Sequence, residues 1–198
     1  MKKHFTLTEI LVVVFLIGVL TAIGFGMYSY AMNSAKESGT RALLTRLEAA
    51  LETCNTKFGY LPPTRSSGSN AAFKEIRIEI DDDGMVTSLC FDENEEVSDD
   101  YLKEFLRTVD AENLKKNLQQ EGSNDYYVLI DGWGNKIYYA YPGKFNKTGY
   151  DLYSAGADGR MGSSATGAAT ASALGGASIT DFKDSSTNEV LCDDIFNF

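Results

Sequence analysis

Apolar residues dominate the first part of the chain, and their spacing changes partway along it. Between Glu9 and Lys36 no Asp, Glu, Lys or Arg occurs, and residues 10–25 are almost all aliphatic. Such a run approaches the roughly 20 residues that a helix needs to cross a bilayer core of about 30 Å. The pattern therefore predicts a membrane-spanning helix, whose N-terminal end Lys2 and Lys3 place in the cytoplasm by the positive-inside rule.

The helical spacing continues beyond residue 32 as an amphipathic pattern. Apolar residues recur there at steps of three and four, at Leu43, Leu47, Ala50, Leu51, Cys54 and Phe58. No proline occurs before Pro62, so we predict one continuous helix over residues 5–58. A secretory signal peptide is the alternative for its first part, but the apolar run is long for such a peptide and no A-x-A cleavage site follows it.

Strand patterns follow in the second half of the chain. Residues 126–130 and 136–141 are rich in aromatic and β-branched side chains and flank a turn with Gly and Asn, which predicts an antiparallel hairpin. Residues 150–154 are a third candidate strand. One face of a three-stranded sheet would cover the apolar stripe of the long helix, which gives an α+β domain over residues 61–198. The tyrosines of these strands fit a packed core better than a sugar-stacking platform.

Three further segments lie around these strands. Alternating residues over 73–91, with an Asp83-Gly84 turn, predict an inserted β-hairpin. The acids at 81–83 fit turn chemistry better than an EF-hand, because no glutamate follows at the required spacing. Residues 98–118 predict a helix capped by Ser98, with an apolar face of Tyr101, Leu102, Phe105, Leu106 and Val109. Residues 162–178 are nearly all Gly, Ala, Ser and Thr, and predict a mobile inserted loop.

Charge and composition narrow the classes of function. The formal net charge is -10, and such an acidic surface disfavours nucleic acid as a partner and favours divalent cations. Three scattered cysteines form no CxxC pair; in an oxidising compartment two could pair, and the spacing leaves open which two. His4 is the only histidine, so Ser154 has no base to activate it, and no Gly-rich phosphate cradle occurs. We therefore predict that the chain is not an enzyme.

The N-terminus resembles that of type IV pilins and of type II secretion pseudopilins. Residues 5–9 (FTLTE) precede the aliphatic run, as in prepilins that carry a short basic leader. The resemblance implies that a prepilin peptidase cuts between His4 and Phe5 and methylates the new amine, which makes 1–4 a leader and 5–32 the transmembrane and filament-core half of the helix. It also implies that Glu9 pairs with the N-terminal ammonium of an adjacent subunit. Glu9 fits a capping box with Thr6 equally well, and both roles stay open.

Segments of the tail resemble the major, G-type pseudopilins of type II secretion in the same order. They are residues 55–62 (NTKFGYLP), 131–139 (DGWGNKIYY), 142–143 (PG), 151–159 (DLYSAGADG) and 193–198 (DDIFNF). The family has glycine where His4 stands and proline where Gly132 stands. The resemblance implies that the amphipathic half of the helix, 33–60, leads into a pilin-type globular domain.

The same resemblance implies a calcium site. Its ligands would be Asp158, one or both of Asp193 and Asp194, and the carbonyl of Ala155. Calcium takes six to eight oxygens, which separated carboxylates and carbonyls can supply. The intervening insertion adds little cost, because the entropy of closing a loop grows slowly with its length. The alternative is that these acids only decorate a solvated loop.

These expectations combine into one function. The chain is expected to be a structural subunit of a bacterial type II secretion pseudopilus, anchored once in the inner membrane with its domain in the periplasm or outside the cell. Its expected partners are copies of itself, related minor pseudopilins, the prepilin peptidase and the inner-membrane assembly platform. The alternatives are a type IV pilus subunit and a membrane-anchored or secreted calcium-dependent binding module.

Overall fold

The computed structural model describes residues 7–64, 73–92, 95–122, 126–162, 167–184, 186–187, 189–190 and 192–198. The expected processing residues His4 and Phe5, and with them Thr6 of the capping box, lie outside these ranges. The chain divides into two compact units, Met1–Lys36 and Glu37–Phe198.

One helix, α1 (Leu7–Phe58), contributes to both units and is 52 residues long. Its apolar first part is long and hydrophobic enough to cross a membrane. The helix ends where the sequence predicts, because Gly59 takes a left-handed conformation (φ 78°) and donates its N–H to the Asn55 carbonyl over 2.8 Å. The break at Gly59 thus ends α1 inside the globular unit, which begins at Glu37.

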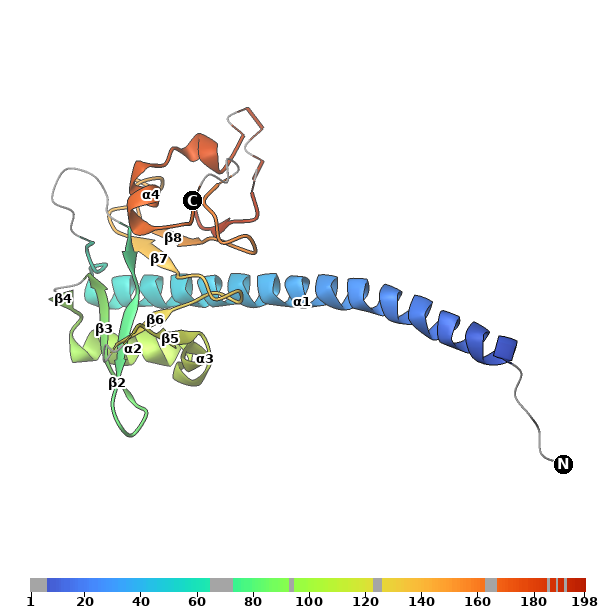
Figure 1. Ribbon diagram of the computed structural model, residues 1–198. Helices are drawn as coiled ribbons and strands as arrows, with labels where there is room; N and C mark the ends of the chain where they lie inside the picture. The colour runs from blue at the N-terminus through green and yellow to red at the C-terminus, as the bar shows by residue number, and fades with distance from the viewer. Residues whose placement is uncertain are drawn as a thin grey trace. The chain divides into compact units, whose positions relative to one another are not determined.

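The globular unit contains two antiparallel sheets (Figure 1). The first has the order β1-β7-β8-β9, with bounds Lys74–Glu75, Tyr138–Ala140, Asp151–Ser154 and Ile195–Phe196. The second has the order β4-β3-β2-β6-β5, with bounds Glu95–Glu96, Val86–Asp92, Arg77–Ile80, Tyr126–Leu129 and Leu118–Gln120. The α+β class is confirmed, but the three-stranded sheet was too small a prediction.

The predicted hairpin of 126–130 with 136–141 is wrong beyond its first rung. Ile130 and Lys136 form an isolated bridge, after which β6 pairs with β2 and β5 while β7 pairs with β1 and β8. In separate sheets both strands gain neighbours on two sides, so more backbone groups find hydrogen-bond partners than in a lone hairpin. The 73–91 segment provides strands to both sheets, because β1 pairs with β7 in the first and β2 lies at the centre of the second.

The predicted helix over 98–118 is interrupted. Ser98 caps α2 (Asp99–Val109) by accepting from the Tyr101 N–H at 3.4 Å. Asp110 then takes φ 71°, and its carboxylate caps α3 (Ala111–Lys115) by accepting from the Glu112 N–H at 3.3 Å. Leu118 already belongs to β5. Asp tolerates the left-handed region and competes for backbone donors, which explains the break.

The segment predicted as a mobile loop is structured where it is described. It contains the short helix α4 (Ala171–Gly176), and a 3-10 turn follows at Ile179–Asp181. Leu174, the only large side chain of this segment, is fully buried. The ammonium of Lys144 donates to the carbonyls of Leu174 and Gly175 at 3.1 and 2.7 Å. One buried leucine and one capping lysine therefore fix a sequence that composition alone marks as flexible.

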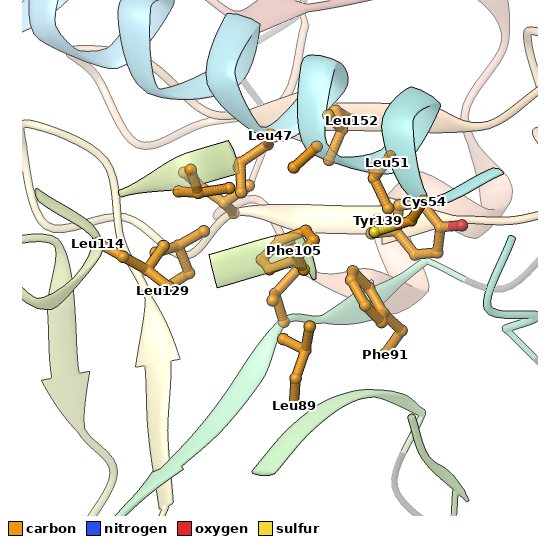
Figure 2. Close-up of a cluster of buried hydrophobic side chains, with 14 of the residues drawn as sticks. Leu47, Leu51, Cys54, Leu89, Phe91, Phe105, Leu114, Leu129, Tyr139 and Leu152 are labelled. Atoms are coloured by element: carbon orange, nitrogen blue, oxygen red, sulfur yellow. The ribbon is translucent and has the colours of Figure 1, made fainter. Parts of the chain in front are cut away.

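The main core joins the second half of α1 to both sheets and to α2. Figure 2 shows Leu47, Leu51 and Cys54 projecting from α1 toward Phe105 and Tyr139. All five side chains are fully buried. Tyr139 packs in this core and donates its hydroxyl to the Pro62 carbonyl at 3.0 Å. Tyr138 and Tyr153 are buried in a separate cluster, whereas Tyr126 and Tyr127 of β6 are half-buried. The apolar stripe predicted from three- and four-residue spacing is thus the face of α1 that builds the domain.

Candidate functional site

The turn at 131–135 is organised by a single buried carboxylate. Asp131 is 3% exposed, and its Oδ1 accepts from the backbone N–H groups of Trp133 and Asn135, each at 2.8 Å. Gly134 provides the left-handed conformation that the turn requires (φ 93°). The Gly132 N–H donates to the hydroxyl of Thr40 on α1 at 3.0 Å, so the turn is fixed to the helix.

Asn135 connects this turn to the loop in which the resemblance places calcium. Its side-chain amide donates to Asp131 Oδ2 at 3.2 Å and to the Gly156 carbonyl at 2.7 Å. The Ser154 hydroxyl donates to the same Asp131 oxygen at 2.8 Å. The turn therefore determines where the chain leaves β8 and where residues 155–162 begin.

The loop after β8 meets the C-terminal segment at Asp193. Gly156 is left-handed (φ 63°), and any Cβ there would lie 2.2 Å from the Asp193 carbonyl oxygen. The Asp158 N–H donates to Asp193 Oδ2 at 3.0 Å. Ala155 is buried, whereas Asp158 and Asp193 are exposed. Two of the predicted ligands, 35 residues apart, are thus adjacent with solvent-facing carboxylates.

Asp194 faces the interior instead. It is 3% exposed, its Oδ1 accepts from the Tyr153 hydroxyl at 2.7 Å, and its Oδ2 accepts from the Gly162 N–H at 2.6 Å. Burial raises the pKa of the Asp194 carboxyl above its ordinary value, although hydrogen bonds from the Cys192 thiol, Tyr153 and Gly162 favour the ionised form. Neither Tyr153 nor Gly162 was predicted to touch the site, since only the fold brings them to Asp194.

The residues fit calcium in part. Asp158 and Asp193 are exposed residues whose carboxylates are the hard ligands that this ion prefers. One oxygen of each already accepts a backbone N–H, Asp158 Oδ1 from Arg160 at 2.8 Å and Asp193 Oδ2 from Asp158 at 3.0 Å. Within the described ranges, no group of three or more His, Cys, Asp or Glu side chains is placed to share one ion. Calcium at this loop would therefore rely on two carboxylates together with carbonyl groups and water.

At the other end of the chain, Glu9 lies in the first turn of α1 and is exposed. The side chains around it in sequence are apolar and exposed as well, with Ile10 at 53% and Leu16 at 53%. A negative charge at the start of a helix is favoured by the helix dipole. The unit Met1–Lys36 thus presents one acid beside a long apolar surface.

The three cysteines are free thiols in this structure. Cys54 is buried in the main core, and Cys90 and Cys192 are half-buried. Burial raises the pKa of Cys54 to about 11 and that of Cys192 to about 12, so both remain protonated thiols near neutral pH. Cys54 is therefore a packing group of the core, whereas the Cys192 thiol is a hydrogen-bond partner of Asp194.

Comparison with protein families gives one match. The model of the family described as type II secretion system (T2SS), protein G, matches residues 99–172. This range runs from α2 to α4 and includes the 131–135 turn and the loop after β8. The match supports the resemblance to type IV pilin-like pseudopilins and a role in type II secretion. Comparisons with curated proteins and with solved structures each gave no match.

Proposed function

We propose that this chain is a structural, non-enzymatic subunit that polymerises through its N-terminal helix into a type II secretion pseudopilus and so drives protein export. The observation that carries the proposal is that the family match and a long apolar helix occur in the same chain. The protein G family match covers the centre of the globular unit, and α1 continues from that unit into a long apolar stretch. The match favours a pseudopilus subunit over a type IV pilus subunit.

The apolar stretch supports polymerisation because none of its side chains that the structure describes is buried. In the unit Met1–Lys36, large side chains such as Leu11, Phe15 and Leu20 are 63%, 66% and 69% exposed. Each would gain about 1.5–3 kcal/mol on full burial. A bilayer supplies that environment before assembly, and the helices of neighbouring subunits supply it in the filament.

Glu9 gives the assembly its register. A carboxylate in a membrane helix costs up to about 2.5–3.5 kcal/mol on insertion scales and less near the interface. Pairing with the N-terminal ammonium of a neighbour's Phe5 offsets this cost only when the two helices are correctly staggered. Processing between His4 and Phe5 by a prepilin peptidase creates that ammonium.

The same proposal determines location and partners. The anchor spans the inner membrane once, Lys2 and Lys3 stay in the cytoplasm, and the globular unit lies in the periplasm or beyond. The subunit assembles with copies of itself and with minor pseudopilins on an inner-membrane assembly platform. Addition of subunits lengthens the filament and pushes exported proteins outward.

Calcium is proposed as the bound ion of the globular unit. Asp158 and Asp193 would supply exposed carboxylate oxygens, with the Ala155 carbonyl beside them. The resemblance adds Asp194, whose oxygens already accept two hydrogen bonds. Bound calcium would neutralise part of the charge of -10 and hold the loop after β8 against the C-terminal segment.

The experiment that tests the filament is mass spectrometry of the mature N-terminus, combined with an assembly assay. An N-methylated Phe5 is expected. Glu9→Gln is expected to insert normally and to abolish filaments recovered by shearing, whereas Glu52→Gln on the exposed face of α1 is the matched control and is expected to assemble. An intact Met1, a cut beyond Met32, or full assembly of Glu9→Gln would contradict the proposal.

A further inference from the structure

The described part of the insertion brings its own hydrophobic anchors to the C-terminal segment. We use second core for the buried cluster Phe73, Tyr138, Ala140, Tyr153, Ala155, Leu174, Ala177 and Phe182. Leu174 of the insertion and Phe182, which lies just after it, are both fully buried in it. Phe182 stacks edge-on against Tyr153 of β8 at 5.8 Å and Phe196 of β9 at 5.6 Å between ring centroids. The chain just after the insertion therefore packs directly on the last two strands of the sheet, in the core that Leu174 also enters.

The start of the insertion is fixed by a close backbone contact. Gly162 is left-handed (φ 67°), and any Cβ there would lie 2.6 Å from the carbonyl oxygen of Asp181. The start of the insertion is thus held against Asp181, which lies just after its end. This contact also orients the Gly162 N–H, which donates to Asp194 Oδ2 at 2.6 Å.

Asp194 completes the arrangement from the C-terminal side. Each of its oxygens accepts from a neutral donor, one in β8 and one at the start of the insertion. A carboxylate can accept on both oxygens, whereas an amide can accept on only one. With 3% of the residue exposed, a hydrated ion would have to displace these donors to reach it, whereas the neighbouring Asp193 is open to solvent.

We propose that Asp194 is a positioning residue rather than a calcium ligand, and that the insertion takes over the structural role that a calcium ion would have at this position. Hydrogen bonds from Tyr153 and Gly162, together with packing in the second core, hold β9 in place without metal. Calcium binding is then confined to Asp158, Asp193 and neighbouring carbonyls. The statement about calcium binding rests on the proposed function. The statement that Asp194 positions the C-terminal segment rests on the contacts alone.

Adjacent aspartates provide matched variants for the test. Thermal unfolding of the full-length protein in detergent micelles is monitored by near-ultraviolet circular dichroism, once with calcium and once with EGTA. Calcium affinity is measured separately by titration calorimetry. Asp194→Asn is expected to lower the midpoint by about 2–4 °C in both conditions, because one buried hydrogen bond is lost. Its calcium affinity should stay within about twofold of wild type, a change below 0.5 kcal/mol.

Asp193→Asn is expected to do the reverse. It should weaken calcium binding more than about tenfold and leave the midpoint in EGTA within about 1 °C, because its side chain is exposed. Tyr153→Phe keeps the Asp194 carboxylate, removes one donor, and is expected to lower the midpoint in EGTA as Asp194→Asn does. Tyr153→Phe also tests the positioning role if Asp194→Asn fails to fold.

Three outcomes are decisive. Loss of calcium binding in Asp194→Asn with an unchanged midpoint in EGTA would overturn the inference. The inference would also be overturned if removing calcium with EGTA lowered the wild-type midpoint by as much as the Tyr153→Phe substitution lowers it. If wild type binds no calcium yet Asp194→Asn and Tyr153→Phe both melt early, the positioning role is supported and the calcium part of the proposed function is refuted.

Discussion

The hydroxyl of Ser154 donates a hydrogen bond to Oδ2 of Asp131 over 2.8 Å, and both residues are buried. This contact joins the end of β8 to the turn between the two sheets. Asp131 accepts four hydrogen bonds in total, from Trp133, Asn135 (backbone and side chain) and Ser154. One carboxylate therefore fixes both the turn and the base of the candidate calcium loop.

Replacing this carboxylate by its amide is expected to be costly. Asp131→Asn places an NH₂ group against at least one donor and should lower the free energy of unfolding by about 2–4 kcal/mol, because buried partners are left unsatisfied. Ser154→Ala removes only one donor and should cost about 1 kcal/mol. Urea unfolding of the full chain in micelles measures both. Equal small effects for the two variants would show that the network carries little stability.

A second prediction concerns the ion pairs that link the two sheets. The Lys136 ammonium contacts the carboxylates of Glu75 in β1, at 2.9 Å, and of Glu121 just after β5, at 2.5 Å. The hydrogen bond from Lys136 lowers the pKa of Glu121 below 4.5. Burial alone would lower the pKa of Lys136, but its bonds to Glu121 and Glu75 raise it above 10.5.

The sign of the pH dependence follows from these shifts. Glu121 contributes to folding stability above its unfolded pKa, and this contribution is lost as the pH falls through its lowered pKa in the folded state. Lys136 contributes below its unfolded pKa, and its contribution is lost as the pH rises through its raised pKa in the folded state. Lys136→Met should therefore melt earlier than wild type near pH 7, and the difference should shrink near pH 3. Lys115→Met, which breaks an exposed pair with Glu112, is the control and should change the midpoint little. A difference that is the same at both pH values would contradict the role of the pairs.

A third prediction separates the two halves of α1. Leu51 is fully buried, so Leu51→Ala should lower the free energy of unfolding of the globular unit by about 2–5 kcal/mol. Leu16 is 53% exposed in the other unit, so Leu16→Ala should change that quantity by less than about 0.5 kcal/mol. Chemical denaturation followed by the fluorescence of Trp133 reports on the globular unit. An effect of Leu16→Ala comparable to that of Leu51→Ala would place the core elsewhere.

Two left-handed glycines give a fourth prediction. Gly59 and Gly156 both have positive φ, but a Cβ at Gly59 meets nothing within 4 Å, whereas one at Gly156 meets the Asp193 carbonyl at 2.2 Å. Gly59→Ala should cost about 1 kcal/mol, from the backbone conformation alone. Gly156→Ala should cost about 2–5 kcal/mol and separate the loop from Asp193. Thermal melting compares the two, and similar losses would mean that the loop can move away from Asp193 at little cost.

Local rules predicted much of the framework. The start of α2 follows from Ser98, the end of α1 from Gly59, and the β2–β3 turn from Asp81 to Gly84, where the Asp81 carboxylate accepts from the Met85 N–H at 2.7 Å. Each depends on groups within a few residues of one another. The break at Asp110 was missed because the apolar spacing continues across it, and only the backbone conformation shows that two helices share one capping residue.

The candidate site was predictable only in outline. The sequence marks Asp158, Asp193 and Asp194 as three similar acids. The fold makes them different: Asp158 and Asp193 meet at the surface, while Asp194 turns inward to Tyr153 and Gly162. No local pattern distinguishes two adjacent aspartates when their difference depends on a donor 41 residues away.

The sequence by itself determined the long apolar helix, its amphipathic continuation and the α+β class, because periodicity and turn residues act over short stretches of chain. Only the tertiary structure decided that β6 and β7 separate into two sheets, that the Gly- and Ala-rich insertion is anchored by Leu174, and that Asp194 is buried. The physical reason is that strand partners and buried acceptors are chosen by competition among segments distant in sequence, and that competition is settled only when the whole domain packs.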